Sequence, residues 1–81
     1  MITVNSNETI YTVISKHPDI KEIMVQLGFK DVVKKGMLQS VGRIMTIKKG
    51  CDMKRISFDL VKETFSNYNY DLVEEKLWVN L

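Results

Sequence analysis

Cys51 is the residue of this sequence whose type and neighbours most suggest reactivity. It follows Lys48 and Lys49, and nearby ammonium groups lower the pKa of a thiol, so a nucleophilic or redox role is one interpretation. The other is an inert thiol. Cys51 lies four residues after Ile47 on one face of an expected helix, and a free cysteine packs as a small apolar side chain. We expect the packed, inert thiol.

Metal and cofactor chemistry find little support in the sequence. His17 is the single histidine, and the five methionines have no spacing that pairs them as ligands, so we expect them to fill the core. No paired cysteines, HExxH, P-loop or GxGxxG motif is present. The sequence therefore predicts a protein that is not an enzyme and that has no metal and no cofactor.

Arg43 is the strongest candidate for a binding residue. It follows Gly42 and precedes Thr46, which is expected to cap a helix that contains Lys48. An arginine beside free helix N–H groups makes an anion pocket. Gly42, Arg43, Thr46 and Lys48 are therefore candidate residues for binding a small anion. The alternative is that Arg43 caps a carbonyl or pairs with a carboxylate.

The charge is distributed unevenly along the chain. Residues 30–55 hold eight basic and two acidic residues, a net charge of +6, whereas residues 1–29 sum to −1 and residues 56–81 to −3. A basic middle third attracts anions, nucleic acids or acidic proteins, although lysines that merely solvate helices give the same composition. The tight turn at Met45–Thr46 between two expected helices resembles a helix-turn-helix. The second helix offers few side chains for reading bases, so we do not expect nucleic-acid binding.

The length and composition indicate one folded domain over residues 1–81, because 44% of the 81 residues are hydrophobic and 27% are charged. So short a chain has little room for a catalytic cavity beside its core, which favours a binding module. The sequence has no apolar run of about 18 residues, no signal-peptide pattern and one cysteine. We therefore expect a cytoplasmic protein that does not associate with a membrane.

Helix signals dominate the first half of the chain. Ile2–Val4 favours an extended segment. Asn7 is a candidate N-cap for a helix over residues 8–16, and Pro18 begins a second helix that runs to Leu27. Gly28 follows, where a left-handed residue commonly ends a helix.

Three further helices are expected in the second half: Met37–Met45, Ile47–Lys54 after a Thr46 cap, and Phe58–Asn67 after a Ser57 cap. Gly42 destabilises the first of these by about 1 kcal/mol relative to alanine, which indicates close packing there. The tail from Asn69 fits a helix as far as Lys76, although Leu77–Val79 also suits a strand paired with Ile2–Val4.

The expected fold is all-α, a compact irregular bundle of about five short helices with a short extended N-terminal segment. So small a domain leaves apolar side chains uncovered, and an exposed apolar patch usually marks a contact site. Tyr70 and Trp78 are the candidate anchors of an interface, because aromatic side chains bury a large area on binding. The alternative for Trp78 is a core position against Ile2 and Val4.

Four segments of the sequence resemble a small bacterial family of unknown function: Thr9–Tyr11, His17–Asp19, Leu27–Phe29 and Val41–Ile47. This family is found alone or fused to redox-disulfide modules that accompany hybrid-cluster proteins. The chain is more distantly similar to the N-terminal domain of the iron–sulfur repair proteins called ScdA. The resemblance covers about Ile2 to Phe65 and implies a helical fold with an accessory role near redox or sensory proteins.

Three departures limit what this resemblance implies. The repair-type domains carry adjacent cysteines after the glycine that ends their second helix, whereas here Phe29–Val32 holds none, so thiol or iron chemistry is not carried over. Lys35-Gly36 stands where the closer family often has Asn-Pro. Gly50-Cys51 falls where that family has small residues, which supports a packed Cys51.

Three functions follow as expectations. The first is a non-catalytic accessory module that binds a protein partner, such as a redox or sensory protein, or a second copy of itself. The second is a domain that binds a small anion or cofactor through Arg43 and a helix N-terminus. The third is a redox protein that uses Cys51. The sequence names neither the partner nor the ligand.

Overall fold

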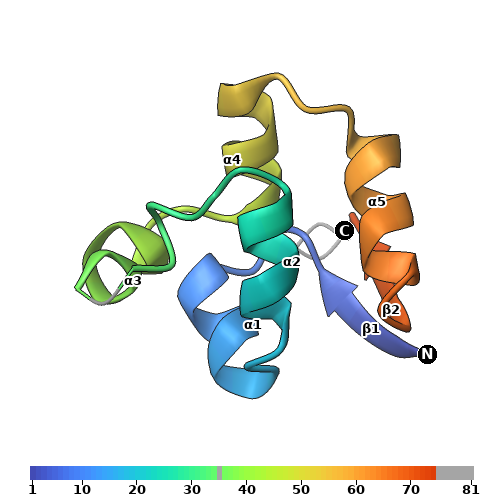
Figure 1. Cartoon of the computed structure of the whole chain (residues 1–81), viewed down its shortest axis with the longest axis horizontal. Helices are drawn as coiled ribbons and strands as arrows, with labels where there is room; N and C mark the ends of the chain where they lie inside the picture. The colour runs from blue at the N-terminus through green and yellow to red at the C-terminus, as the bar shows by residue number, and fades with distance from the viewer. Residues whose placement is uncertain (35, 75–81) are drawn as a thin grey trace, which may run out of the picture.

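A computed structural model describes residues 1–34 and 36–74 of the chain. Figure 1 shows short helices packed around one another, with two strands at one side. The elements are, in order, β1 (Ile2–Asn5), α1 (Ile10–Lys16), α2 (Ile20–Gln26), α3 (Met37–Ser40), the 3₁₀ helix η1 (Val41–Arg43), α4 (Ile47–Lys54), α5 (Phe58–Ser66) and β2 (Tyr70–Val73). In this part of the chain, no helix has the length and apolar character needed to cross a bilayer.

The two strands form a small parallel sheet in which Ile2 lies opposite Tyr70 and Val4 opposite Leu72. Parallel neighbours need a long crossover, and here all the helices make that crossover. Val4 and Leu72 are buried on the core side of the pair. The sheet therefore joins the beginning of the chain to the segment that follows α5, as Figure 1 shows.

The all-α expectation is wrong in this respect, because the mostly helical fold contains a sheet. The predicted helix from Asn69 to Lys76 is replaced over its first part by β2. Asn69 takes a left-handed conformation, φ 66°, which ends the helical path after α5. Burial then alternates along Tyr70–Val73, as it does in a strand with one covered face. Ile2–Val4 pairs with this strand, and the alternative partner, Leu77–Val79, lies outside the described residues.

Helices α1 and α2 begin later than expected. Thr9, rather than Asn7, caps α1: its Oγ1 accepts a hydrogen bond from the N–H of Thr12 at 3.1 Å. Helix α2 begins at Ile20 and ends in a Schellman motif, in which the Phe29 N–H bonds to the Met24 carbonyl. Gly28 lies at the turning point with φ 95°, which confirms its predicted left-handed role.

The single helix predicted for Met37–Met45 is divided into α3 and η1. Ser40, just before its middle, turns its hydroxyl back onto the carbonyl of Gly36 at 2.9 Å, and such back-bonding often bends helices. The backbone of Ser40 departs from helical geometry, with φ −108° and ψ −77°. Beyond Ser40, Ile44 is 75% exposed.

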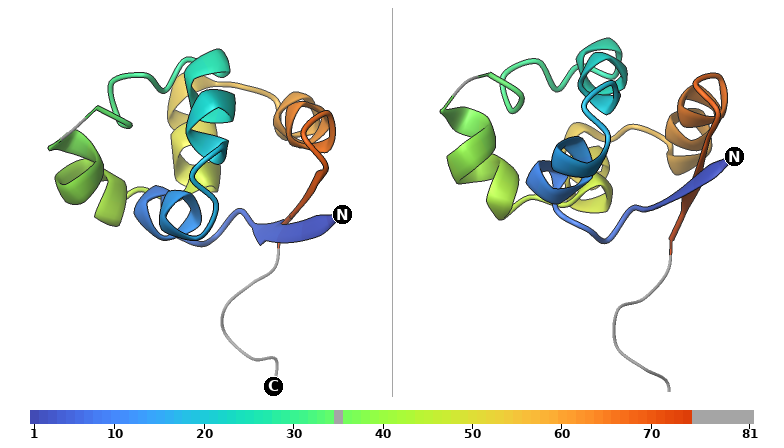
Figure 2. Two further views of the ribbon diagram at one scale, coloured as in Figure 1. Left: turned by 60° about the horizontal axis from the view of Figure 1, so that its bottom comes forward. Right: turned by 90° about the horizontal axis from the view of Figure 1, so that it is seen from below.

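Helix α4 forms over the predicted residues, Ile47–Lys54, after the predicted Thr46 cap. Ser57 precedes α5 as expected, but its side chain makes no capping hydrogen bond. Both views in Figure 2 place α3 at one end of the molecule and α5 with β2 at the other, with α4 between them. The shared core contains residues from both strands and from every α-helix except α3.

Candidate functional site

Arg43 packs against an aromatic ring. Its guanidinium carbon lies 4.4 Å from the centre of the Tyr11 ring, in cation–π geometry. Tyr11 belongs to α1, so the contact fixes η1 against that helix. Neither interpretation from the sequence, an anion pocket or an arginine that caps a carbonyl or pairs with a carboxylate, anticipated this contact. Gly42 beside it is buried, and an added Cβ would lie 2.9 Å from Leu38 Cδ1, which confirms the predicted close packing.

The other candidate anion-binding residues already form hydrogen bonds or an ion pair within the chain. The Lys49 N–H donates to Thr46 Oγ1 at 3.0 Å, and the Lys48 N–H donates to the Ser6 carbonyl at 3.0 Å. The Gly50 N–H donates to the Thr46 carbonyl at 3.0 Å. The Lys48 ammonium forms an ion pair with Glu74. Three N–H groups at the start of α4 thus have acceptors already.

Tyr70, a candidate interface residue, lies in the core and is 5% exposed. Its hydroxyl donates a hydrogen bond of 2.6 Å to the Asp19 carboxylate, and its ring lies 5.4 Å from that of His17. The hydrogen bond to Asp19, with burial and the charge of Asp19, raises the pKa of Tyr70 to about 12. Its position is that of a core residue, while Trp78 lies outside the described residues.

Cys51 is buried, 2% exposed, as the inert interpretation requires. Burial, together with the nearby charge of Asp52, raises the pKa of Cys51 to about 11. Thiolate is the reactive form, so both shielding and protonation oppose reaction at neutral pH. Within the described residues, no group of three or more His, Cys, Asp or Glu side chains is placed to hold a metal ion.

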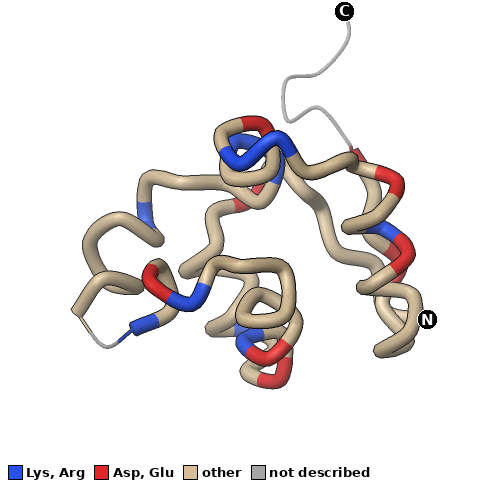
Figure 3. The backbone as a smooth tube through the Cα atoms, turned by 45° about the horizontal axis from the view of Figure 1, so that its top comes forward, with Lys and Arg blue, Asp and Glu red and all other residues tan. Residues whose placement is uncertain are grey.

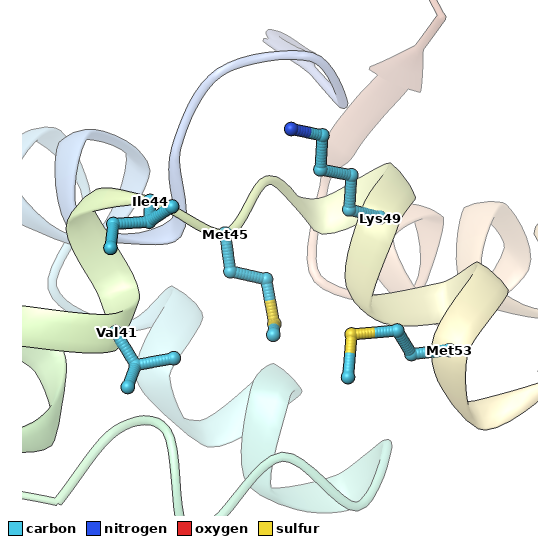
Figure 4. A pocket seen from close by; sticks show the side chains of 5 residues that line it. All are labelled: Val41, Ile44, Met45, Lys49 and Met53. Carbon is cyan, nitrogen blue, oxygen red and sulfur yellow. The ribbon is translucent and has the colours of Figure 1, made fainter.

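An apolar groove lies between η1 and α4, lined by Val41, Ile44, Met45, Lys49 and Met53, and we call it the η1–α4 groove. Its volume is about 250 Å³ and its walls are almost entirely apolar. Figure 4 shows the thioethers of Met45 and Met53 approaching from opposite sides, with the Lys49 ammonium pointing away from them. Such a surface can receive apolar side chains beside a cation.

Close packing behind the groove depends on Gly50. A Cβ on Gly50 would lie 2.7 Å from Phe29 Cε1 and 3.3 Å from Met45 Sδ. The absence of that Cβ lets the buried Phe29 ring and the Met45 side chain pack against α4. The Met45 carbonyl also accepts a hydrogen bond of 2.9 Å from the N–H of Ile10, the first residue of α1.

The groove has an exposed apolar rim. Ile44 is 75% exposed and Met53 is 71% exposed. A lone exposed apolar residue is ordinary, but two of them beside one apolar hollow form a patch. This patch joins two strongly exposed apolar side chains to an apolar hollow.

The groove lies in the basic third of the sequence. Helix α4 carries Lys48, Lys49 and Lys54 against Asp52, and Figure 3 shows basic segments on α4 and acidic segments on α5. Lys49 lines the groove and forms no ion pair with any described residue. Arg43, at the end of η1, is exposed. The electrostatic field at this surface therefore favours acidic groups.

Sequence reasoning did not identify this groove. It predicted one continuous helix over Met37–Met45, which includes Ile44 and Met45, and it expected the methionines to fill the core. One signal was available: Met53 falls outside the Ile47 and Cys51 face of α4, as an apolar residue on the polar side of a helix. Finding the rest required the bend at Ser40.

Comparisons with known proteins agree with a small domain of undefined activity. A family model described as "Domain of unknown function (DUF1858)" matches residues 4–62. The chain is 26% identical to the conserved domain protein from Streptococcus pneumoniae TIGR4, whose crystal structure superposes with a TM-score of 0.86 over 94% of this chain and 96% of that one. No match to a curated protein was found.

Proposed function

The chain belongs to the DUF1858 family of domains of unknown function, and we propose that it is a non-catalytic module that docks a partner protein in the η1–α4 groove. The observation that carries this proposal is the apolar hollow between Met45 and Met53, rimmed by the exposed Ile44. Apolar surface gathered at a hollow is stabilised when a partner covers it.

The size of the groove favours a protein side chain over a small molecule. Pockets for cofactors and drug-sized ligands span about 300–1,000 Å³ and combine apolar walls with a few converging polar groups. The η1–α4 groove, at about 250 Å³, is smaller and has one polar lining residue, Lys49. Methionine side chains adapt their shape to an inserted group, which is why they recur at protein-binding surfaces.

The anion-binding alternative has less support. It needs free N–H groups at the start of α4, but those of Lys48, Lys49 and Gly50 donate to oxygens of the chain itself. The redox alternative depends on Cys51, which is buried and has a raised pKa. Neither observation favours a function other than docking.

The nature of the partner rests on a different argument. The sequence resembles domains that accompany redox-disulfide modules and, more distantly, the N-terminal domain of iron–sulfur repair proteins. We propose a redox or sensory protein as the partner on this resemblance, with the domain acting as its accessory rather than as the site of chemistry.

The test is site-specific photo-crosslinking in cells that naturally make the protein. A photoreactive residue at position 44 should give one protein adduct of defined mass, while the same residue at Val25 should not. Val25 is the matched control, because it is apolar and 45% exposed but lies on α2, outside the groove lining. The adduct at position 44 should disappear in Met53→Asp, since a carboxylate in the groove prevents apolar contact.

Two outcomes would count against docking in the groove. One is an adduct pattern that is the same at positions 44 and 25, or absent at 44. The other is an adduct at 44 that persists in Met53→Asp. Met53 is 71% exposed, so this substitution leaves the fold intact, and a circular dichroism spectrum checks that point.

A further inference from the structure

We infer that the occupant of the η1–α4 groove is an acidic amphipathic helix of another protein, an inference that rests on the proposed function and specifies its partner. Three features of the groove support this assignment: its walls, its charge and its shape. Each feature restricts which kind of partner segment can bind in the groove.

The walls require apolar anchors on the partner. Met45 and Met53 form the two sides, and Ile44 and Met53 continue the apolar surface outward onto the rim. The surface therefore extends beyond the hollow itself. A helix matches such a surface because it projects apolar side chains at positions i, i+3, i+4 and i+7 along one stripe.

The charges require acidic groups beside those anchors. Lys49 lines the groove, and its ammonium points away from the thioethers in Figure 4. Arg43 follows Gly42 in η1 with its guanidinium over the face of Tyr11. A guanidinium held by one face on a ring still presents its N–H edge to a carboxylate. Asp52 is the one acidic residue of α4. Carboxylates that flank an apolar stripe complement this arrangement.

The geometry favours a helix over an added strand. The hollow lies between two helical segments, η1 and α4, where a second helix packs side by side with them. A strand would need exposed backbone donors and acceptors along its path. The start of α4 cannot supply them, because the N–H groups of Lys48 and Lys49 are already bonded within the chain.

The experiment titrates three synthetic peptides against the full-length protein carrying ¹³C-labelled methionine methyl groups. The first peptide is a helix with a leucine stripe flanked by glutamates. The second has lysines in place of the glutamates. The third has the composition of the first in an order that removes the stripe. We expect the first peptide alone to shift the methyl signals of Met45 and Met53, while those of buried Met24 stay in place.

Matched variants test the charges separately. Lys49→Glu should raise the Kd of the glutamate peptide at least about fivefold. Lys62→Glu, a charge reversal at an exposed position of α5, should leave that Kd unchanged. Raising the ionic strength to about 1 M, where the Debye length falls to about 3 Å, should also weaken binding.

Each alternative result has a defined meaning. Equal binding of the lysine peptide at Met45 and Met53 would overturn the acidic assignment while leaving docking in the groove intact. Equal binding of the third peptide, which lacks the leucine stripe, would overturn the assignment of a helical occupant. Methyl shifts that depend on protein concentration alone would identify a second copy as the occupant and overturn the inference. No shift with any peptide would also overturn it, and the crosslinking result would then decide separately whether a partner docks there.

Discussion

The hydroxyl of Tyr70 donates a hydrogen bond of 2.6 Å to the carboxylate of Asp19. The two residues are 51 positions apart, one in β2 and the other in the turn before α2. The bond therefore ties the second strand to the first helical pair. Because Tyr70 is 5% exposed, it acts as a structural link, and substitutions there report on stability rather than on binding.

Tyr70→Phe should lower the free energy of unfolding by about 1 kcal/mol at pH 8, the usual net value of one hydrogen bond. The hydrogen bond to Asp19 raises the pKa of Tyr70 from 10.0 to about 12. Below pH 10 the hydroxyl is protonated in both the folded and the unfolded chain, so its contribution is complete. Between pH 10 and 12 the unfolded chain loses the proton first, so stability falls as pH rises.

Urea unfolding at a series of pH values checks this prediction. The difference between the wild type and Tyr70→Phe should shrink from pH 10 to pH 12. Asp19→Asn should show a reduced alkaline loss for the same reason. A difference that stays constant over this range would mean that the Tyr70 hydroxyl gains nothing from Asp19.

Gly28→Ala should destabilise the domain by about 1 kcal/mol, because a residue with a Cβ is strained at the left-handed position that ends α2. Gly28 has φ 95°, and no atom lies within 4 Å of an added Cβ, so the effect isolates backbone strain from steric overlap. Arg55 provides the reverse test. It ends α4 at φ 57°, so Arg55→Gly should raise stability. Thermal unfolding of both variants measures these effects, and a stabilised Gly28→Ala would contradict the account.

Gly50→Ala should destabilise the domain by about 1 kcal/mol or more, although alanine favours helices. The added Cβ would lie 2.7 Å from the Phe29 ring, which is buried, so the ring must move; overpacking costs about 1–3 kcal/mol. Gly42→Ala is the matched control. There the nearest atom is Leu38 Cδ1, the end of a half-buried side chain that can rotate, so the change should be nearly neutral. Equal loss of stability in both variants, measured by urea unfolding, would refute this distinction.

Cys51 should react with a thiol reagent at pH 8 about 100-fold more slowly in the folded protein than in urea. The rise of its pKa from 9.0 to about 11 lowers the thiolate fraction by roughly this factor, and burial adds shielding. The rate of labelling with a chromogenic disulfide measures the difference. Rapid labelling of a protein whose circular dichroism is unchanged would restore the redox interpretation.

Local signals predicted the helices whose ends are determined by local chemistry. Helix α4 follows Thr46, whose side chain caps it, and α2 ends at Gly28, whose missing Cβ permits a positive φ. The strand β2 could not be predicted in this way. Tyr70–Val73 fits either a helix or a strand by its spacing, and the choice depends on pairing with Ile2–Asn5, about 70 residues away in sequence. Such pairing is a tertiary effect that overrides propensity.

The candidate site was less predictable than the fold. The sequence grouped Gly42, Arg43, Thr46 and Lys48 as one binding site. In the structure the Arg43 guanidinium lies over Tyr11, and Lys48 bonds to Ser6 and pairs with Glu74. Thr46 caps α4 through Lys49 N–H. The η1–α4 groove lies beyond the point where α3 gives way to η1, beside Ser40, whose hydroxyl returns to the Gly36 carbonyl, and Ile44 is exposed there. A periodic pattern cannot show that its own helix is interrupted.

Docking in the groove is tested most directly by purifying the crosslinked partner and measuring its affinity for two matched variants. Ile44→Asp places a charge on the exposed rim of the groove, and Val25→Asp places the same charge on an exposed apolar position of α2. Calorimetric titration should give a Kd raised at least about tenfold for Ile44→Asp, which corresponds to about 1.4 kcal/mol, and a Kd unchanged within about twofold for Val25→Asp. Equal affinities of Ile44→Asp and the wild type would contradict docking in the η1–α4 groove.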